Sequence, residues 1–322
     1  MLDVYRRAKV MGVAMVASLA MAGVSWAGPY SQHSNNPGNP FDAPIAAGDP
    51  RLTAWASAVF DFAPAPGVGA GFDDPANALG PWDGVTASLG DLFEVGVNEP
   101  PDDGTSLLFD DRDPWNGDPN DLGDDYGFLG IDPVGTIIVG FTSPITNRPG
   151  PDFAVFENGF SHDFADNPDH LSWIFAELGY VEVSTDGSSF ARFAAESAHL
   201  ESELDTQFGR SFAALAPTGV YNLAGKHIGV RGGWGTPFDL DDLTSDQLVS
   251  GGQVDLNQIN FVRIVDIVGN GAQLDSNANP IFDTWVGINT GGFDLDAIGV
   301  LPEPATLAMC ALGVMGCARR RR

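Results

Sequence analysis

Short apolar runs separated by turn-forming residues fill the middle of the chain. The runs are rich in Val, Ile and Phe, and clusters of Gly, Pro, Asn and Asp divide them. Such a pattern is typical of strands joined by turns, with few helices. The clearest strands are predicted at 135–141, 152–156, 180–184, 190–193, 227–231, 259–265 and 296–300.

Side chains alternate between two faces within these segments. Val181 and Val183 share one face and Glu182 takes the other, because successive side chains of a strand point in opposite directions. Asp186-Gly187 follows and suits a tight turn with positive φ, so we predict that 180–184 pairs antiparallel with 190–193. The pattern as a whole favours an all-β fold, a β-sandwich or jelly roll with long acidic loops.

One short N-terminal helix is also expected. Asp49-Pro50 offers a helix cap followed by a proline at the first helical position. Apolar residues then recur at helical spacing. These are Leu52, Trp55, Ala56, Val59 and Phe60. The helix would end before Pro64, with its aromatic face packed in the core.

The N-terminal end carries a pattern of another kind. Arg6, Arg7 and Lys9 precede an apolar run over 10–24, which closes on the small-x-small sequence of residues 25–27. These features are typical of a secretory signal peptide, and the run is shorter than the roughly 20 residues that a membrane span needs. We therefore expect a signal peptide over 1–27, cleaved after Ala27, and then a flexible lead-in over 28–53 that is rich in Asn, Pro, Gly and Ser.

The C-terminal end has three parts in order. Pro302, Glu303 and Pro304 precede an apolar stretch over 305–318, and four arginines close the chain. The arginines are Arg319, Arg320, Arg321 and Arg322. Positive charge stays on the inner side of a membrane, which leaves the body outside, and the apolar stretch is short for a permanent span. A kinked polar site before a removable apolar tail is the logic of other sorting signals.

This tail resembles the PEP-CTERM sorting signal. The resemblance implies that exosortase, a membrane-embedded enzyme, recognises and cuts the segment 302–322 after the Sec machinery has exported the chain. The body would then contact the inner membrane only transiently, through its tail. It would end at the cell surface or in the extracellular matrix of a Gram-negative bacterium.

The body carries a second resemblance, on blocks that occur in order at 78–81, 88–90, 141–145, 151–159, 181–187 and 292–297. Together they are similar to a family of bacterial surface and PEP-CTERM proteins with a discoidin-like, galactose-binding-like sandwich. The resemblance implies a β-sandwich domain over 54–301. It also implies a binding or structural module rather than an enzyme.

The predicted processing makes the protein more acidic. The whole chain has 43 acidic and 15 basic residues, for a net charge of −28. Three of the basic residues lie in the signal and four in the tail, so the released body keeps eight against 41 acidic residues. This charge argues against nucleic acid or anionic lipid as a partner, because it repels phosphates.

Calcium is the cofactor that this composition favours. Both cysteines, Cys310 and Cys317, lie in the tail, so the released body has no thiol for a disulfide. Carboxylate and amide oxygens are the ligands that Ca²⁺ prefers. Among the aspartates of 102–125, Asp111 and Asp113 have a spacing that lets both side chains reach one ion; a solvated acidic loop is the alternative.

Further candidate calcium ligands fall in two patterns. Asp275, Asn277, Asn279 and Asp283 match positions 1, 3, 5 and 9 of a calcium loop, although Pro280 replaces its glycine, and an Asn-rich turn explains them as well. A repeated Phe-Asp-Leu-Asp motif places two carboxylates on one strand face, to bind calcium or to meet solvent. Its carboxylates are Asp239 and Asp241 in the first copy and Asp294 and Asp296 in the second.

Glu157 is the remaining candidate, because it follows an apolar strand. It would be a buried carboxylate satisfied either by backbone donors or by a metal ion. Enzyme signatures such as G-x-S-x-G, H-E-x-x-H and the P-loop are missing from the sequence. We therefore expect a non-catalytic protein; the alternative is a secreted polysaccharide hydrolase that uses an Asp/Glu pair.

Tryptophans offer a surface for binding extracellular polysaccharide. Trp115 and Trp234 lie in polar or glycine-rich segments, where an indole ring can stack on a sugar. Packing in the core is the alternative for each. The sequence thus predicts an exported, calcium-stabilised β-sandwich with a glycan as a candidate partner.

Overall fold

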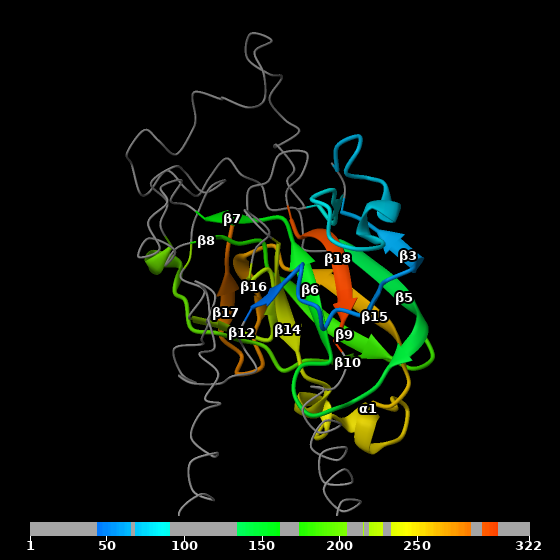
Figure 1. The fold of residues 1–322 in the computed structure, drawn as a ribbon. Helices are drawn as coiled ribbons and strands as arrows, with labels where there is room; N and C mark the ends of the chain where they lie inside the picture. The colour runs from blue at the N-terminus through cyan, green and yellow to red at the C-terminus, as the bar shows by residue number, and fades with distance from the viewer. Residues whose placement is uncertain are drawn as a thin grey trace, which may run out of the picture.

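Two antiparallel sheets packed face to face form the main part of the described structure (Figure 1). The computed structural model describes residues 44–65, 68–90, 134–161, 174–204, 215, 219–227, 233–284 and 292–301. The predicted all-β sandwich is confirmed, and the one α-helix in these ranges is the single turn α1 (Gln247–Ser250). No helix of the described residues is long and apolar enough to cross a membrane.

Sheet A has the order β1-β14-β6-β18-β2, and β4 pairs with β18 beside this path. Its strands are β1 (Ile45–Ala46), β2 (Ala54–Trp55), β4 (Ala87–Ser88), β6 (Phe153–Glu157), β14 (Trp234–Phe238) and β18 (Asp294–Val300). The first of these strands falls within the predicted lead-in, so pairing starts before residue 54.

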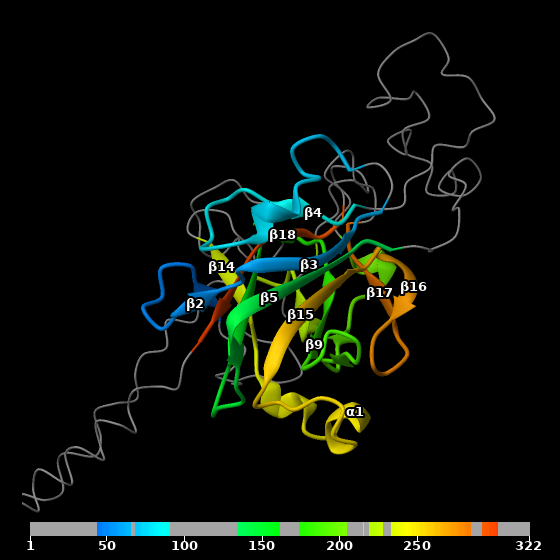
Figure 2. The ribbon, with the colours of Figure 1, turned by 90° about the vertical axis from the view of Figure 1, so that its right-hand side faces the viewer.

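Sheet B has the order β10-β9-β15-β5-β3, and β13 pairs with β9 beside this path; Figure 2 shows β3, β5, β15 and β9 side by side. Its strands are β3 (Ala58–Ala63), β5 (Thr136–Ile145), β9 (Gly179–Ser184), β10 (Ala191–Arg192), β13 (Leu223–Ala224) and β15 (Ile259–Asp266). Together with β6 and β18, these strands confirm six of the seven predicted strands. The seventh, predicted at 227–231, lies outside the described residues except for residue 227.

Short ribbons and turns complete the fold. The ribbons pair β7 (Phe160–Ser161) with β8 (Ile174–Phe175), β11 (Glu196–Ser197) with β12 (Val220–Tyr221), and β16 (Asn270–Leu274) with β17 (Pro280–Phe282). The single-turn 3-10 helices are Pro75–Ala78, Glu201–Glu203 and Leu240–Leu243.

The core explains why β6 is apolar along most of its length. Along β6, Phe153 and Val155 face the main cluster between the sheets, whereas Ala154 and Phe156 enter a second cluster on the outer face of sheet A. All five residues of β6 are buried, because both faces of the strand are covered.

The predicted helix over 49–60 is wrong, because this segment forms β2 and β3. The chain passes from one sheet to the other here: the N–H of Ala56 donates to Ile298 of sheet A, and that of Ser57 to Gly140 of sheet B. The apolar residues therefore divide between two clusters. Trp55 packs on the outer face of sheet A, while Val59 packs against the core between the sheets.

Candidate cation site

Three strand ends place buried carboxylates near one another in the fold. β6 ends at Glu157, β18 begins at Asp294, and β15 ends at Asp266. β18 pairs with β6 on one side, and on the other Asp294 lies opposite Ser88 of β4. The backbone N–H of Phe293 donates to Asp266 Oδ1 at 2.7 Å, which ties the end of β15 in sheet B to the start of β18 in sheet A.

All three carboxylates are buried, with exposed fractions of 0% for Glu157, 3% for Asp294 and 1% for Asp266. Glu157 Oε1 accepts a hydrogen bond from the N–H of Gly159 at 2.7 Å. Within the described structure, Glu157 Oε2 and Asp294 Oδ1 are buried without a hydrogen-bond partner. An unpaired buried carboxylate oxygen costs free energy, so a proton or a cation bound at these atoms would stabilise the fold.

Burial also raises the pKa of both groups. For Glu157 the pKa lies well above its usual value, mainly because of desolvation and then because of the negative charge of Asp294; the N–H groups of Gly159 and Asn158 act in the opposite direction. Burial raises the pKa of Asp294 despite hydrogen bonds from Ser88 and Asn158. The two adjacent carboxylates therefore favour a neutral state or a shared positive charge.

The ligands on offer are hard oxygens. Glu157 and Asp294 supply carboxylates and Ser88 a hydroxyl, which suit Ca²⁺ better than a soft metal, whereas the Asn158 amide turns its N–H groups toward Asp294 and Thr86. Groups of three or more Asp, Glu, His or Cys side chains placed to hold a metal are absent from the described part of the chain. A cation here would thus rest on two carboxylates and neutral oxygens.

Asp296, the second carboxylate of the later Phe-Asp-Leu-Asp motif, adds negative charge nearby. It is 1% exposed and accepts hydrogen bonds from the N–H groups of Asp83 at 3.2 Å and Gly84 at 2.7 Å. Burial raises its pKa to about 6, and its charge in turn helps to raise the pKa of Glu157.

The earlier copy of the motif has a different structure. Asp239 caps the 3-10 helix Leu240–Leu243, with Oδ1 accepting from the N–H of Asp241 at 2.9 Å. Asp241 is exposed and accepts a hydrogen bond from Asn147 at 2.7 Å. The two copies belong to separate places in the fold, so the structure does not bring their four carboxylates together.

Asp152, which the sequence did not single out, lies buried beside the earlier copy. Its two oxygens accept hydrogen bonds from the N–H groups of Arg148 and Leu240, each at 2.9 Å. Burial is the largest cause that raises its pKa, to about 7. Its role here is to join the end of β5 to the 3-10 helix.

The calcium-loop match around Asp275 forms a hydrogen-bonded turn. Asp275 Oδ1 accepts from the N–H groups of Asn277 and Asn279, each at 2.8 Å, and Oδ2 accepts from Ser197 and from the Asn279 amide, each at 3.1 Å. Asp283 lies apart, fully buried, with Oδ2 accepting from the N–H of Leu178 at 2.8 Å. The loop's polar side chains therefore do not converge on one point.

The remaining predicted site residues do not join the cluster. Trp234 is half-buried in β14, where it lies opposite Ala46. Asp111, Asp113 and Trp115 lie outside the described residues, as do the predicted signal peptide and sorting tail.

Asp266 is the member of the cluster that sequence reasoning missed. Its signal resembles that of Glu157, since both are acidic residues that follow an apolar run at the end of a buried strand. Such a position places the carboxylate inside the sandwich rather than in a loop.

Comparison of the chain with protein-family models and with curated protein sequences found no match.

Proposed function

We propose that this protein is an exported, non-catalytic β-sandwich displayed at the cell surface or in the extracellular matrix, stabilised by calcium. The observation that carries the calcium proposal is the pair of unpartnered, buried oxygens on neighbouring carboxylates, Glu157 Oε2 and Asp294 Oδ1. A divalent cation between them would offset the repulsion and the desolvation of both charges.

Composition supports the same proposal. The released body would contain no cysteine, so disulfides cannot supplement its core. Bound calcium is an alternative source of stability for an exported domain, and it forms with ligands that the chain has in excess.

Burial also favours a structural role for these carboxylates over hydrolysis. A glycosidase needs its two carboxyl groups on either side of a sugar bond, in contact with substrate and water. Glu157 and Asp294 are 0% and 3% exposed and lie between strand ends, where a polysaccharide cannot reach them. Trp234, which is half-buried, is our proposed contact for a matrix glycan; loss of polysaccharide binding in Trp234→Ala tests it.

Thermal unfolding of the full chain tests the calcium site. Saturating Ca²⁺ should raise the Tm relative to excess EDTA by about 5–10 °C, since a ligand at 100 times its Kd adds about 2.7 kcal/mol to the free energy of unfolding. The shift should disappear in the double variant Glu157→Gln/Asp294→Asn, which keeps the shape of both side chains but removes their charge.

The matched control is Asp73→Asn, which removes one charge from an exposed loop residue. It should respond to calcium like the unaltered protein. A Tm that ignores calcium, or a calcium shift that survives in the double variant, would contradict the site.

A further inference from the structure

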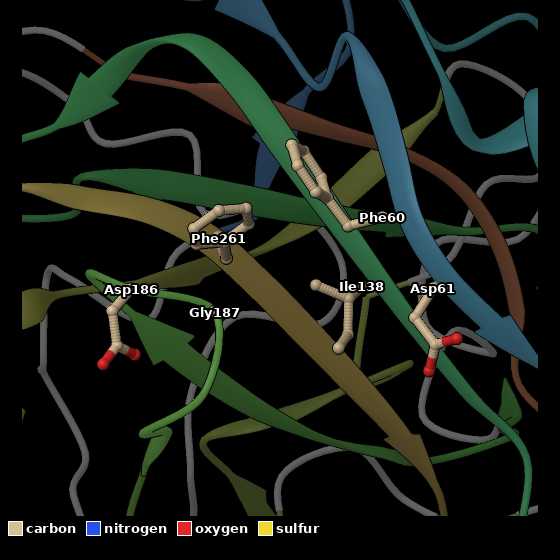
Figure 3. Close-up of a pocket in the computed structure, with 6 residues that line it drawn as sticks. All are labelled: Phe60, Asp61, Ile138, Asp186, Gly187 and Phe261. Carbon is tan, nitrogen blue, oxygen red and sulfur yellow. The ribbon is translucent and has the colours of Figure 1, made fainter.

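A half-open groove on the outer face of sheet B lies apart from the carboxylate cluster (Figure 3). Its volume is about 570 Å³. Its lining residues are Phe60, Asp61, Ile138, Asp186, Gly187 and Phe261.

A β-bulge creates one wall of the groove. The pairing of β3 with β5 shifts register between Val59 and Asp61, so Phe60 and Asp61 both face outward, while Val59 and Phe62 pack against the core. The ring of Phe60 lies over Gly140, where a Cβ would come within 2.3 Å of Cε2. Because Gly140 has no side chain, the Phe60 ring can lie against the sheet at this position.

Two aromatic rings form the floor. Phe60 and Phe261 meet edge to face, with ring centroids 4.6 Å apart and an interplanar angle of 90°. Phe60 is nevertheless 61% exposed, which leaves a large apolar side chain in contact with solvent. Gly187, in the positive-φ region at +77°, brings the 185–189 turn up against Phe261.

Two carboxylates lie at opposite ends of the rings in Figure 3. Asp61 is exposed on β3. Asp186 accepts hydrogen bonds from the N–H groups of Ser188 and Ser189, each at 2.8 Å, and these bonds hold its pKa well below the usual range. None of the six lining residues is basic, so both ends of the groove are negative.

On the same face of sheet B, two arginines of the chain itself contact both an aromatic ring and a carboxylate. The Arg263 guanidinium lies 4.0 Å from the centroid of the Phe190 ring and pairs with Glu182. Arg192 lies 4.2 Å from the centroid of the Tyr180 ring and also pairs with Glu182, at 2.7 Å. Each arrangement joins an aromatic ring, a carboxylate and a guanidinium.

We propose that the groove binds a basic segment of a partner polypeptide. An arginine or lysine side chain from the partner would lie against Phe60 and Phe261, and Asp61 or Asp186 would meet its charge. The net charge of −28 would attract such a segment over distance.

A neutral glycan fits the groove less well. Its hydroxyl groups need donors as well as acceptors, and the side chains of the six lining residues offer only the two carboxylates as hydrogen-bonding groups. Phenylalanine and isoleucine match the aliphatic stem of a basic side chain instead. This binding site is independent of calcium and of the proposed function.

Fluorescence anisotropy on the full chain tests the proposal, with a labelled tetra-arginine peptide as the probe and a tetra-citrulline peptide as its uncharged counterpart. We expect the arginine peptide alone to bind. Phe60→Ala should weaken it about three- to fivefold, the range that corresponds to an exposed cation–π contact, and Asp61→Asn should weaken it by a similar factor.

Matched controls separate the groove from general acidity. Leu200→Ala removes an apolar side chain with the same exposed fraction of 61%, and Asp73→Asn removes an equivalent charge elsewhere. Both should bind the peptide like the unaltered protein. The proposal is overturned if all four variants bind alike, if citrulline binds as well as arginine, or if a neutral hexasaccharide displaces the peptide.

Discussion

Asp294 shows how a single buried carboxyl group connects the stability of this protein to pH. In an unfolded chain an aspartate has a pKa near 4, whereas burial raises the pKa of Asp294 to about 7 in the fold. The folded state therefore keeps protons that the unfolded state releases, and the free energy of unfolding falls as pH rises from about 4 to about 7. Glu157, Asp152 and Asp296 shift in the same direction.

We accordingly predict that the chain in EDTA is most stable near pH 4–5 and loses stability toward pH 8. Calcium should reverse the loss above pH 7, because it replaces the protons that Glu157 and Asp294 give up. Urea unfolding at several pH values, with EDTA and with Ca²⁺, measures both effects. Asp186 and Asp275, whose pKa values are lowered, act in the opposite sense, but only below about pH 4.

The double variant Glu157→Gln/Asp294→Asn separates the cluster from the other buried acids. Its stability in EDTA should depend less steeply on pH between 5 and 8, because two of the titrating groups are gone. An unchanged slope would place the proton linkage elsewhere, at Asp152, Asp283 or Asp296, where burial also raises the pKa.

Single residues also show what the sequence can and cannot reveal about the site. Glu157 and Asp294 stand out because acidic residues next to apolar strands are visible in the sequence. Their meeting depends on pairing between strands that are far apart in the chain, which spacing does not record. The Asp275 match fails because other donors occupy both oxygens in place of a metal: N–H groups of the local turn bind Oδ1, while the distant Ser197 N–H and the Asn279 amide bind Oδ2.

Among the elements, β15 is a central strand of sheet B with neighbours on both edges. It lies between β9 and β5 over most of its length, and Val262 and Ile264 point into the main core. Its sequence predicted it well, because the segment is rich in β-branched residues, of which Val262 and Ile264 flank the polar Arg263. Strands of this kind can be identified from sequence without knowledge of their neighbours.

The segment over 49–60 is the opposite case. Its apolar spacing fits a helix, but the same residues serve two different sheets, with Trp55 on one and Val59 on the other. The bulge that turns both Phe60 and Asp61 outward breaks the alternation that would have signalled a strand. Tertiary pairing thus decides the structure where the local pattern is ambiguous.

We predict that Ile264→Ala lowers the free energy of unfolding by about 2–5 kcal/mol, because it leaves a cavity in the main core. Leu274→Ala is the control: Leu274 lies on β16 with 49% of its surface exposed, and its loss should cost well under 1 kcal/mol. Urea denaturation of both variants measures the difference. Equal losses would mean that β15 is not the centre of the cooperative unit.

At the scale of the whole molecule, the outer faces of the two sheets differ in what covers them. The outer face of sheet A is covered by its own apolar cluster, whereas part of the outer face of sheet B carries charged and aromatic side chains in the open. The carboxylate cluster lies at the ends of β6 and β15 and at the start of β18, apart from that open face. Stability and partner binding can therefore be tested separately.

The proposed export pathway makes a chemical prediction about the mature protein. The whole chain has two cysteines, at positions 310 and 317, and both would leave with the sorting tail. Protein recovered from the surface of a host that has exosortase should therefore contain no thiol, whereas the full chain made without export should contain two. Thiol titration under denaturing conditions measures this, and N-terminal sequencing should begin at Gly28.

Replacing Arg319, Arg320, Arg321 and Arg322 by Ser is the matched variant. If the arginine run orients the tail for cleavage, this chain should keep its thiols and stay with the inner membrane, because only the inner-side charge has been removed. Its folded body should still show the same calcium response, since the substitutions lie beyond residue 301. Surface protein that retains two thiols would contradict tail removal, whatever the outcome of the calcium experiment.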